Sequence, residues 1–254
     1  MRRSLLIFGL LSLAAVWLAP LPQIGRHSFW AHMTMHMVVV AVAAPLLAFG
    51  VAGRKFDPVP KAPKLFAPIP ASIVELIAVW AWHAPVLHHA ARHSTAGFLA
   101  EQATFLLTGL VMWLSAFGGD SASSGSRRAA GVIGLLLTSM HMTLLGALLA
   151  LAPRPLFHHA EGHSTLSPLD DQHLGGAIML LVGGISYLAG GLWLTLSLMR
   201  SSAVIGTEVD RCAQNISRNA LASGLSGEEP GLAPCGSSTI RKHQSVPHKS
   251  GENP

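Results

Sequence analysis

Long apolar segments without charged clusters recur along this chain, and they restrict the folds open to it. Half of the 254 residues are hydrophobic and only 11% are charged. Because an α-helix rises about 1.5 Å per residue, about 20 apolar residues cross the hydrocarbon core of a bilayer. The sequence therefore predicts an all-α, polytopic membrane bundle of about six transmembrane helices, at residues 4–20, 29–50, 71–92, 96–118, 130–152 and 174–198.

The basic residues predict how these helices are oriented. If the segments alternate across the bilayer, fourteen of the 17 Lys and Arg residues fall on one side, and Arg26, Arg92 and Arg154 fall on the other. Cytoplasmic loops carry an excess of basic residues, so both termini are predicted in the cytoplasm. The net charge of +5 then needs no nucleic-acid partner to explain it.

Three parts follow from this topology. Residues 1–28 are expected to form a first transmembrane helix or an uncleaved signal-anchor, with a cleaved signal peptide as the alternative. Residues 29–199 form the membrane bundle, and residues 200–254, which are polar and lack a sustained apolar period, are expected to be a disordered cytoplasmic tail. Cys212 and Cys235 lie in that tail at a spacing that matches no zinc or redox motif, so we expect free thiols.

Histidines mark the opposite side of the predicted bundle, which holds twelve of the 14. His32 and His36 are four residues apart at the start of an apolar segment, so their imidazoles share one helix face. Met33, Met35 and Met37 alternate with them, and thioethers are soft metal ligands. This pattern favours a late-transition-metal site over two imidazoles that merely hydrogen-bond to neighbouring helices.

Two more histidines are predicted to lie deep in the membrane, where an ionisable group is costly unless it finds partners. His83 lies about 13 Å from the outer end of the third segment, and it could act as a ligand or satisfy the carbonyl freed by Pro85. His141 lies near the middle of the fifth segment, between Met140 and Met142 in sequence.

The outer end of the last segment carries Asp171 and His173. Asp171 could orient an imidazole, bind a metal directly or cap a helix N-terminus. The remaining outer histidines lie in loops or at the interface, and each is expected to be solvated: His27, His88, His89, His93, His158, His159 and His163.

Four motifs occur in order over residues 29–198. They are His32-Met33-x-x-His36-Met37 followed by Ala44-Pro45-Leu46-Leu47, then Trp82-His83-x-Pro85, then Met140-His141-Met142-x-x-x-Gly146-Ala147-Leu148-Leu149, and Asp171-Gln172-x-x-Gly175-Gly176. This series resembles the membrane-integral cytochrome c oxidase assembly factors of the CtaG type. The fourth segment departs from that family, because Gln102 follows Glu101 where the family has histidine, and we therefore leave Glu101 out of the expected ligand set.

The resemblance implies an assembly factor for a haem-copper cytochrome c oxidase, and not an enzyme. It implies a multi-pass protein of the bacterial plasma (inner) membrane, with the histidine-rich side facing the periplasm. The implied partners are oxidase subunits and the lipid bilayer, with no nucleic acid, and the implied cofactor is copper.

With copper as the metal, the expected ligands are His32, His36, His83 and His141, with thioether contacts from Met33, Met37, Met140 or Met142, and with Asp171 and His173 at the outer mouth. Two alternatives use the same histidines. A membrane b-type haem protein would place two of them on the iron. An outer-facing metal-dependent membrane enzyme would use the paired histidines as a catalytic site.

Overall fold

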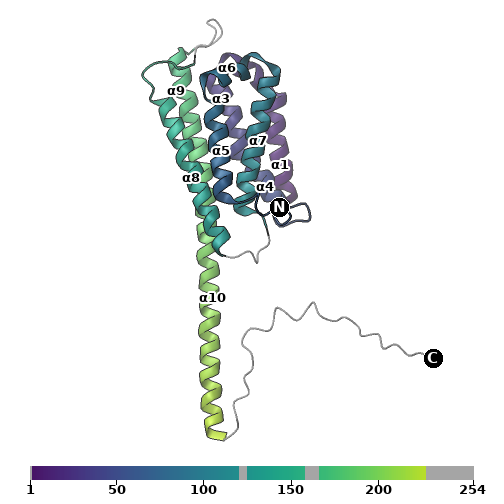
Figure 1. Ribbon diagram of the computed structural model, residues 1–254, viewed down its shortest axis with the longest axis vertical. Helices are drawn as coiled ribbons and strands as arrows, with labels where there is room; N and C mark the ends of the chain where they lie inside the picture. The colour runs from purple at the N-terminus through teal and green to yellow at the C-terminus, as the bar shows by residue number, and fades with distance from the viewer. Residues whose placement is uncertain (1, 120–124, 158–165, 227–254) are drawn as a thin grey trace, which may run out of the picture. The chain divides into compact units, whose positions relative to one another are not determined.

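The computed structural model describes residues 2–119, 125–157 and 166–226, and all regular secondary structure in these ranges is helical (Figure 1). The chain separates into two compact units, Met1–Leu198 and Met199–Pro254. The helical elements are α1 (Arg2–Leu18), α2 (Leu21–His27), α3 (Phe29–Met37), η1 (Val38–Ala43), α4 (Ala44–Val51), α5 (Pro68–Trp82), α6 (Pro85–His93), α7 (Thr95–Phe117), α8 (Gly125–Ala150), α9 (Pro168–Ile178), η2 (Met179–Gly183) and α10 (Gly184–Ser226).

Four helices within the described ranges are long and apolar enough to cross a membrane by themselves: Phe29–Val51, Thr95–Phe117, Gly125–Ala150 and Pro168–Arg200. Two bent pairs, α1 with α2 and α5 with α6, bring the number to six if each pair is one span. The prediction of an all-α polytopic bundle is therefore confirmed. Single π-helical turns, η1 and η2, interrupt two of the spans without ending them.

The third span differs from the straight helix predicted for residues 71–92. α5 ends at Trp82, and α6 continues after a bend of 73°. Ala84 has extended backbone angles (φ −66°, ψ 136°), because the ring of Pro85 excludes the helical conformation from the residue before it. His83 therefore lies at the C-terminal end of α5, and the depth of about 13 Å that assumes an unbroken helix is wrong.

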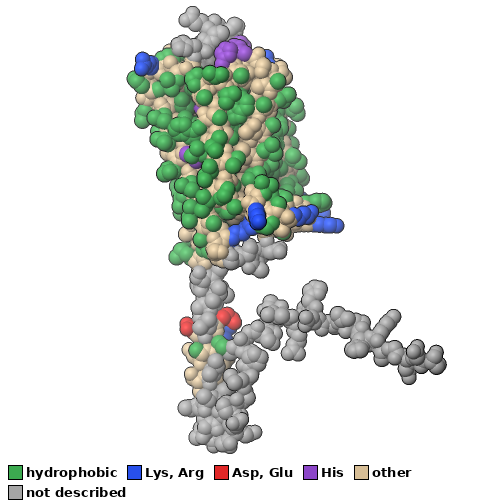
Figure 2. All heavy atoms as spheres, in the orientation of Figure 1, with side chains coloured by type: hydrophobic (Ala, Val, Ile, Leu, Met, Phe, Trp, Pro, Cys, Tyr) green, Lys and Arg blue, Asp and Glu red, His purple; other side chains and the backbone are tan. Residues whose placement is uncertain are grey.

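Apolar side chains cover the outside of the bundle as well as its core (Figure 2). Leu10, Ile77, Leu107, Leu144 and Ile185 come from five different helices, and each is more than half exposed. A surface of this kind is expected where lipid, and not water, surrounds the protein.

Close helix contacts hold the bundle together. A Cβ atom added at Gly176 would lie 2.5 Å from the backbone N of Ala150, so α8 and α9 approach closely at a position that only glycine allows. Small residues serve this purpose in membrane bundles, where packing replaces the hydrophobic effect as the source of association.

A buried carboxylate connects the three helices α5, α8 and α10. Glu75 of α5 is fully buried, and it accepts hydrogen bonds from the Tyr187 hydroxyl (2.5 Å) and the Thr138 hydroxyl (3.2 Å). Ser72 lies 2.9 Å from the same threonine, oxygen to oxygen. Because each carboxylate oxygen has a partner, this network is satisfied within the fold.

The predicted tail begins as a helix, since α10 continues to Ser226 instead of ending near residue 200. Residues 201–226 contain no proline, and local helix propensity is enough to continue a span that is already formed. Cys212 is disulfide-bonded, so the expectation of a free thiol is wrong there; spacing in sequence does not report distance in space. Residues 227–254, with Cys235, lie outside the described residues.

Candidate metal centre

α3 presents the two histidines that the sequence singles out. His32 and His36 are one helical turn apart and each is 2% exposed, with ring centroids 4.3 Å from one another. The prediction that they share a buried face is confirmed.

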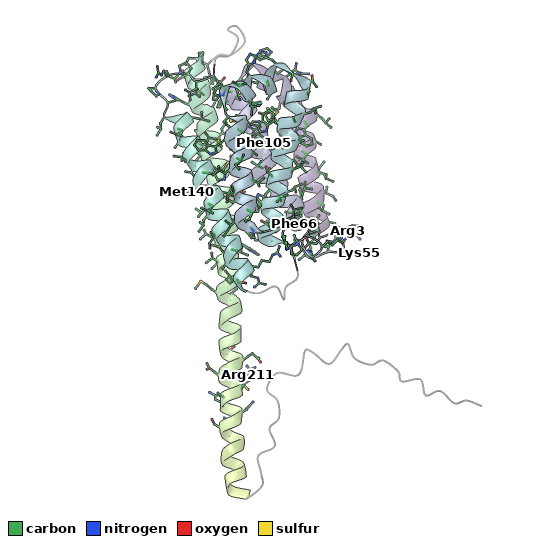
Figure 3. All side chains as sticks on the ribbon, viewed as in Figure 1. Arg3, Lys55, Phe66, Phe105, Met140 and Arg211 are labelled. Atoms are coloured by element: carbon green, nitrogen blue, oxygen red, sulfur yellow. The ribbon has the colours of Figure 1, made fainter. Side chains whose placement is uncertain are left out.

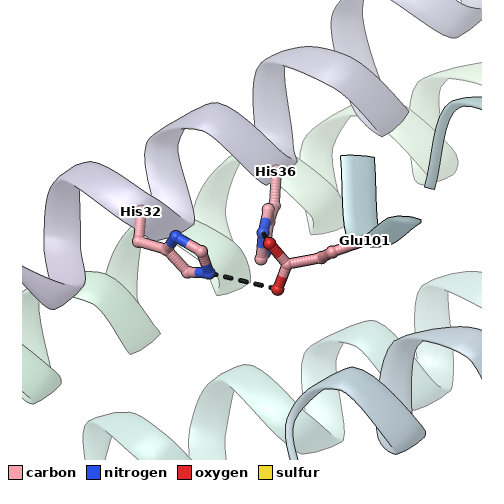
Figure 4. A group of neighbouring side chains, drawn as sticks. All are labelled: His32, His36 and Glu101. Atoms are coloured by element: carbon pink, nitrogen blue, oxygen red, sulfur yellow. Dashed lines mark hydrogen bonds and ion pairs between the residues drawn. The ribbon is translucent and has the colours of Figure 1, made fainter. Parts of the chain in front are cut away.

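Glu101 of α7 lies against both histidines (Figure 4). Its Oε1 is 3.2 Å from Nε2 of His32, and its Oε2 is 3.2 Å from Nε2 of His36. The carboxylate has no solvent exposure. Among the described residues these three form a group of candidate ligand atoms that lie within 4.8 Å of one another.

The two contacts of Glu101 are not equivalent. The contact with His32 has hydrogen-bond geometry, whereas His36 lies at ion-pair distance and makes no hydrogen bond. Both ring nitrogens of His36 and Oε2 of Glu101 thus have no hydrogen-bond partner in the described part of the chain. Buried polar atoms are nearly always paired in folded proteins, and two of these atoms, Nε2 of His36 and Oε2 of Glu101, meet only each other at 3.2 Å, so they are candidate ligand atoms.

His83 approaches the same group from the end of α5. Its Nδ1 donates to the backbone oxygen of Val79 (2.7 Å), and its ring centroid is 6.0 Å from that of His36. A neutral imidazole that donates through Nδ1 keeps its lone pair on Nε2, which lies 3.4 Å from the sulfur of Met33. The structure therefore brings both a nitrogen and a thioether sulfur to the edge of the cluster.

His88 of α6 also belongs to this cluster, although the sequence suggested a solvated residue. It is 4% exposed, its ring is 5.2 Å from that of His32, and neither of its nitrogens has a partner among the residues described. The bend at Ala84 is the reason, because it folds α6 back over the end of the bundle.

Aromatic rings close the cluster from two sides. Phe105 of α7 lies 4.4 Å from the ring of His36, and Phe157 lies 4.3 Å from the ring of His88. Both phenylalanines are buried. An apolar wall of this kind excludes water and strengthens any electrostatic interaction within it.

The structure does not bring His141 into the group. This residue of α8 is 3% exposed, and among the described residues it makes no ring contact and no hydrogen bond. Met142 is fully buried, whereas Met140 is 65% exposed and points away from the bundle (Figure 3). Adjacent residues of a helix point in different directions, so flanking in sequence did not predict a shared site.

Among the methionines of α3, the sulfur of Met33 is the one that lies against a histidine, His83, in the described part of the chain. The sulfur of Met37 lies 3.7 Å from the position of a Cβ atom added at Gly183, so it faces the junction of η2 and α10.

Asp171 has a different role from metal ligation. Its carboxylate accepts hydrogen bonds from the backbone N–H groups of Phe29 (2.7 Å) and Trp30 (2.9 Å) and from the Ser28 hydroxyl (3.0 Å). It thereby caps the N-terminus of α3, while the N-cap of its own helix is Ser167. The expectation of a helix cap is confirmed, on a helix other than its own. His173 donates a hydrogen bond from Nε2 to the backbone oxygen of Ala152 (2.9 Å), and it is not among the residues grouped with His32 and His36 in the described part of the chain.

Sequence reasoning missed Glu101 as a member of the site. A carboxylate in an apolar span is costly unless it is paired, and this signal was present in the fourth segment. The sequence does not show that Glu101 pairs with His32 and His36, because this contact depends on how α3 and α7 pack.

The separations fit one bound metal ion. Nitrogen and carboxylate ligands lie about 2.1 Å from a first-row ion, so two ligands of the same ion are at most about 4.2 Å apart. The two 3.2 Å nitrogen to oxygen distances satisfy this limit. All three ligand atoms, one each from His32, His36 and Glu101, lie within 4.8 Å of one another, so the group is a candidate site for one ion, with His83 and His88 beside it.

Fold and site together define a polytopic helical membrane protein with a buried cluster of histidines and one glutamate. The family model described as cytochrome c oxidase caa3 assembly factor matches residues 1–201. The chain belongs to this family, and it is a cytochrome c oxidase assembly factor by that membership. No curated protein and no solved structure matches the chain significantly.

Proposed function

We propose that this assembly factor binds copper at His32, His36 and Glu101 and supplies it to a cytochrome c oxidase subunit. The observation that carries the proposal is the buried Glu101 carboxylate against His32 and His36, where atoms of His36 and Glu101 make no hydrogen bond. Copper is the cargo that suits an oxidase assembly factor with such a cluster of potential ligands, because haem-copper oxidases contain copper.

The ligand types favour copper among the first-row metals. Imidazole and carboxylate suit Cu(II), and the thioether of Met33 beside His83 suits Cu(I). Copper also has the highest affinity of the divalent first-row series for a given nitrogen and oxygen site. The absence of cysteine from residues 1–211 is compatible with a site in an oxidising compartment.

The distribution of charge supports a periplasmic location for the site. Arg3 and Lys55 lie at one end of the bundle, near the N-terminus (Figure 3). Exposed histidines gather at the opposite end (Figure 2), and Phe105, whose ring lies against His36, is on that side of the bundle (Figure 3). Basic ends of membrane proteins face the cytoplasm. We therefore place the copper site in the outer half of the bacterial plasma membrane, where it is able to meet an oxidase subunit alongside.

The haem alternative has less support from the geometry. In a bis-histidine haem a porphyrin lies between the two ligating rings, whereas His32 contacts His36 and His88 directly, at 4.3 and 5.2 Å between centroids. The glutamate that lies against both nitrogens would also be unusual as a neighbour of haem iron. We further propose that the protein is not an enzyme, since the cluster is enclosed by Phe105 and Phe157.

The experiment compares two histidine pairs in a strain that lacks the gene. His89 and His93 on α6 are also four residues apart, with rings 4.0 Å from each other, but both are exposed. We expect the variant His32→Ala/His36→Ala to leave the oxidase low in activity and in copper content, and His89→Ala/His93→Ala to restore both. Full restoration by the first variant would overturn the proposal.

A further inference from the structure

A cavity of about 330 Å³ opens at the end of the bundle opposite the candidate metal centre. The long span Phe29–Val51 connects the two, because His32 lies near its start and Ala52, which lines the cavity, follows its end. The start of α1, the ends of α4 and α7, the start of α8 and residues 193–197 of α10 surround the cavity. It thus lies among helix ends at one end of the bundle.

Three arginines line the polar side of this cavity: Arg2, Arg127 and Arg128. Arg2 donates to the backbone oxygen of Ala52 (2.5 Å), and Arg127 donates to that of Phe66 (3.4 Å) while its Nε has no partner. In the described ranges neither Arg2 nor Arg127 forms an ion pair with a carboxylate. The positive charges of Arg2 and Arg127 are therefore available to an anion.

Asp57, a buried carboxylate of the described residues at this end of the bundle, is already engaged with backbone groups. Asp57 is 3% exposed and accepts hydrogen bonds from the N–H groups of Gly53 (2.7 Å), Val59 (2.9 Å) and Gly119 (2.8 Å). Gly53 and Gly119 both have positive φ, and both line the cavity. Asp57 thus fixes two turns of the cavity wall.

The other side of the cavity is apolar. Phe49 and Phe117 pack with ring centroids 4.5 Å apart, and Leu194 lies beside them. Trp193 also lines the cavity and is 65% exposed, so the apolar side continues onto the outer, lipid-facing surface. A free inorganic anion would use only the arginines, whereas a phospholipid would use the arginines and the apolar wall together.

We propose that this cavity binds an anionic phospholipid, with the headgroup phosphate at Arg2 and Arg127 and an acyl chain along Phe117 and Trp193. Basic pockets between transmembrane helices bind such headgroups by charge, and the anionic lipids of the cytoplasmic leaflet provide them. The site is independent of copper, and it would anchor the end of the bundle that carries most of the basic residues.

The test uses the full chain in nanodiscs of equal parts phosphatidylglycerol and phosphatidylcholine, with retained lipids counted by native mass spectrometry. We expect the unchanged protein to retain phosphatidylglycerol in preference to phosphatidylcholine. Arg2→Gln/Arg127→Gln should reduce the affinity for phosphatidylglycerol about thirtyfold, at about 1 kcal/mol per arginine. The matched control Lys61→Gln/Lys64→Gln removes two exposed charges of the same end that do not line the cavity, and it should keep the preference.

Two further measurements keep the test decisive. The thermal midpoint of Arg2→Gln/Arg127→Gln in detergent reports whether this double variant folds. Arg127→Lys retains the positive charge, so it should retain the lipid. Inorganic phosphate, titrated without lipid, should not stabilise the protein to the extent that phosphatidylglycerol does. Equal stabilisation by phosphate, no preference in the unchanged protein, or an equal loss in the lysine control would each overturn the proposal.

Discussion

The Asp171 carboxylate accepts a hydrogen bond of 2.7 Å from the backbone N–H of Phe29, which precedes it by 142 residues. This contact fixes the start of α3 against α9, one turn before His32. The N-terminal N–H groups of a helix have no partner within the helix, so a carboxylate supplied by another helix both satisfies them and sets where the helix begins. The position of the candidate metal ligands thus depends on a residue that does not contact them.

Asp171→Ala should destabilise the protein by about 2 kcal/mol, because it leaves two buried donors and one partly buried donor without an acceptor. It should also weaken copper binding, since α3 loses its anchor. Thermal unfolding in detergent, with and without copper, measures both effects. Asp170→Ala is the matched control: this neighbour is exposed and bonds only within its own helix turn in the contacts described, so its effect should stay below about 1 kcal/mol. Equal losses for the two variants would contradict the capping role.

Adjacent histidines of α6 should behave differently. His88→Ala should lower the affinity for copper by about tenfold, because His88 lies in the cluster with both nitrogens unpaired. His89→Ala should leave it unchanged, since His89 is exposed. Competition with a copper chelator on the two purified variants gives the comparison. A larger effect of His89 would place the metal on the surface.

Much of this architecture is predictable from the sequence, for a physical reason. A span needs about 20 apolar residues whatever it packs against, so hydropathy locates the helices, and a shared face for His32 and His36 follows from helix geometry alone. The bend at Ala84 was also encoded in Pro85, but its effect on His88 depends on where α6 folds back. Local rules give a kink without giving its direction.

Partners between helices were not predictable in the same way. Glu101 meets His32 and His36 only because α7 packs against the span that contains α3. Its depth and its flanking methionines suggested His141 as a ligand. Depth, however, gives only the position along the membrane normal, and it does not tell which residues of other helices a side chain will contact.

Substitutions of the two candidate thioether ligands, Met33 and Met140, should differ in their effect on Cu(I) affinity. Met33→Ala should weaken Cu(I) binding more than Cu(II) binding, because thioether sulfur is a soft ligand and lies 3.4 Å from His83 Nε2. Met140→Ala should change neither, since Met140 is 65% exposed on α8. Titration with Cu(I) and Cu(II) under matched conditions measures the difference. A loss of Cu(I) affinity in Met140→Ala alone would show that the sulfur ligand is the other methionine.

The Glu75 network should contribute to stability and not to metal binding. Tyr187→Phe removes one hydrogen bond to the buried carboxylate and should cost about 1 to 3 kcal/mol in unfolding free energy. Its copper affinity should equal that of the unchanged protein, because Glu75 is not in the metal cluster. The measurement is thermal unfolding in parallel with copper titration, and reduced copper binding in a folded Tyr187→Phe protein would contradict the separation of the two sites.

The most direct test of the copper site is the copper affinity of the purified full chain with Glu101→Gln, compared with Glu75→Gln. Both substitutions neutralise a fully buried glutamate of a membrane helix, but only Glu101 lies between His32 and His36. We predict that Glu101→Gln lowers the affinity by more than about tenfold while Glu75→Gln leaves it unchanged. Equal copper affinity in the two variants, or no copper bound by the unchanged protein, would contradict the account.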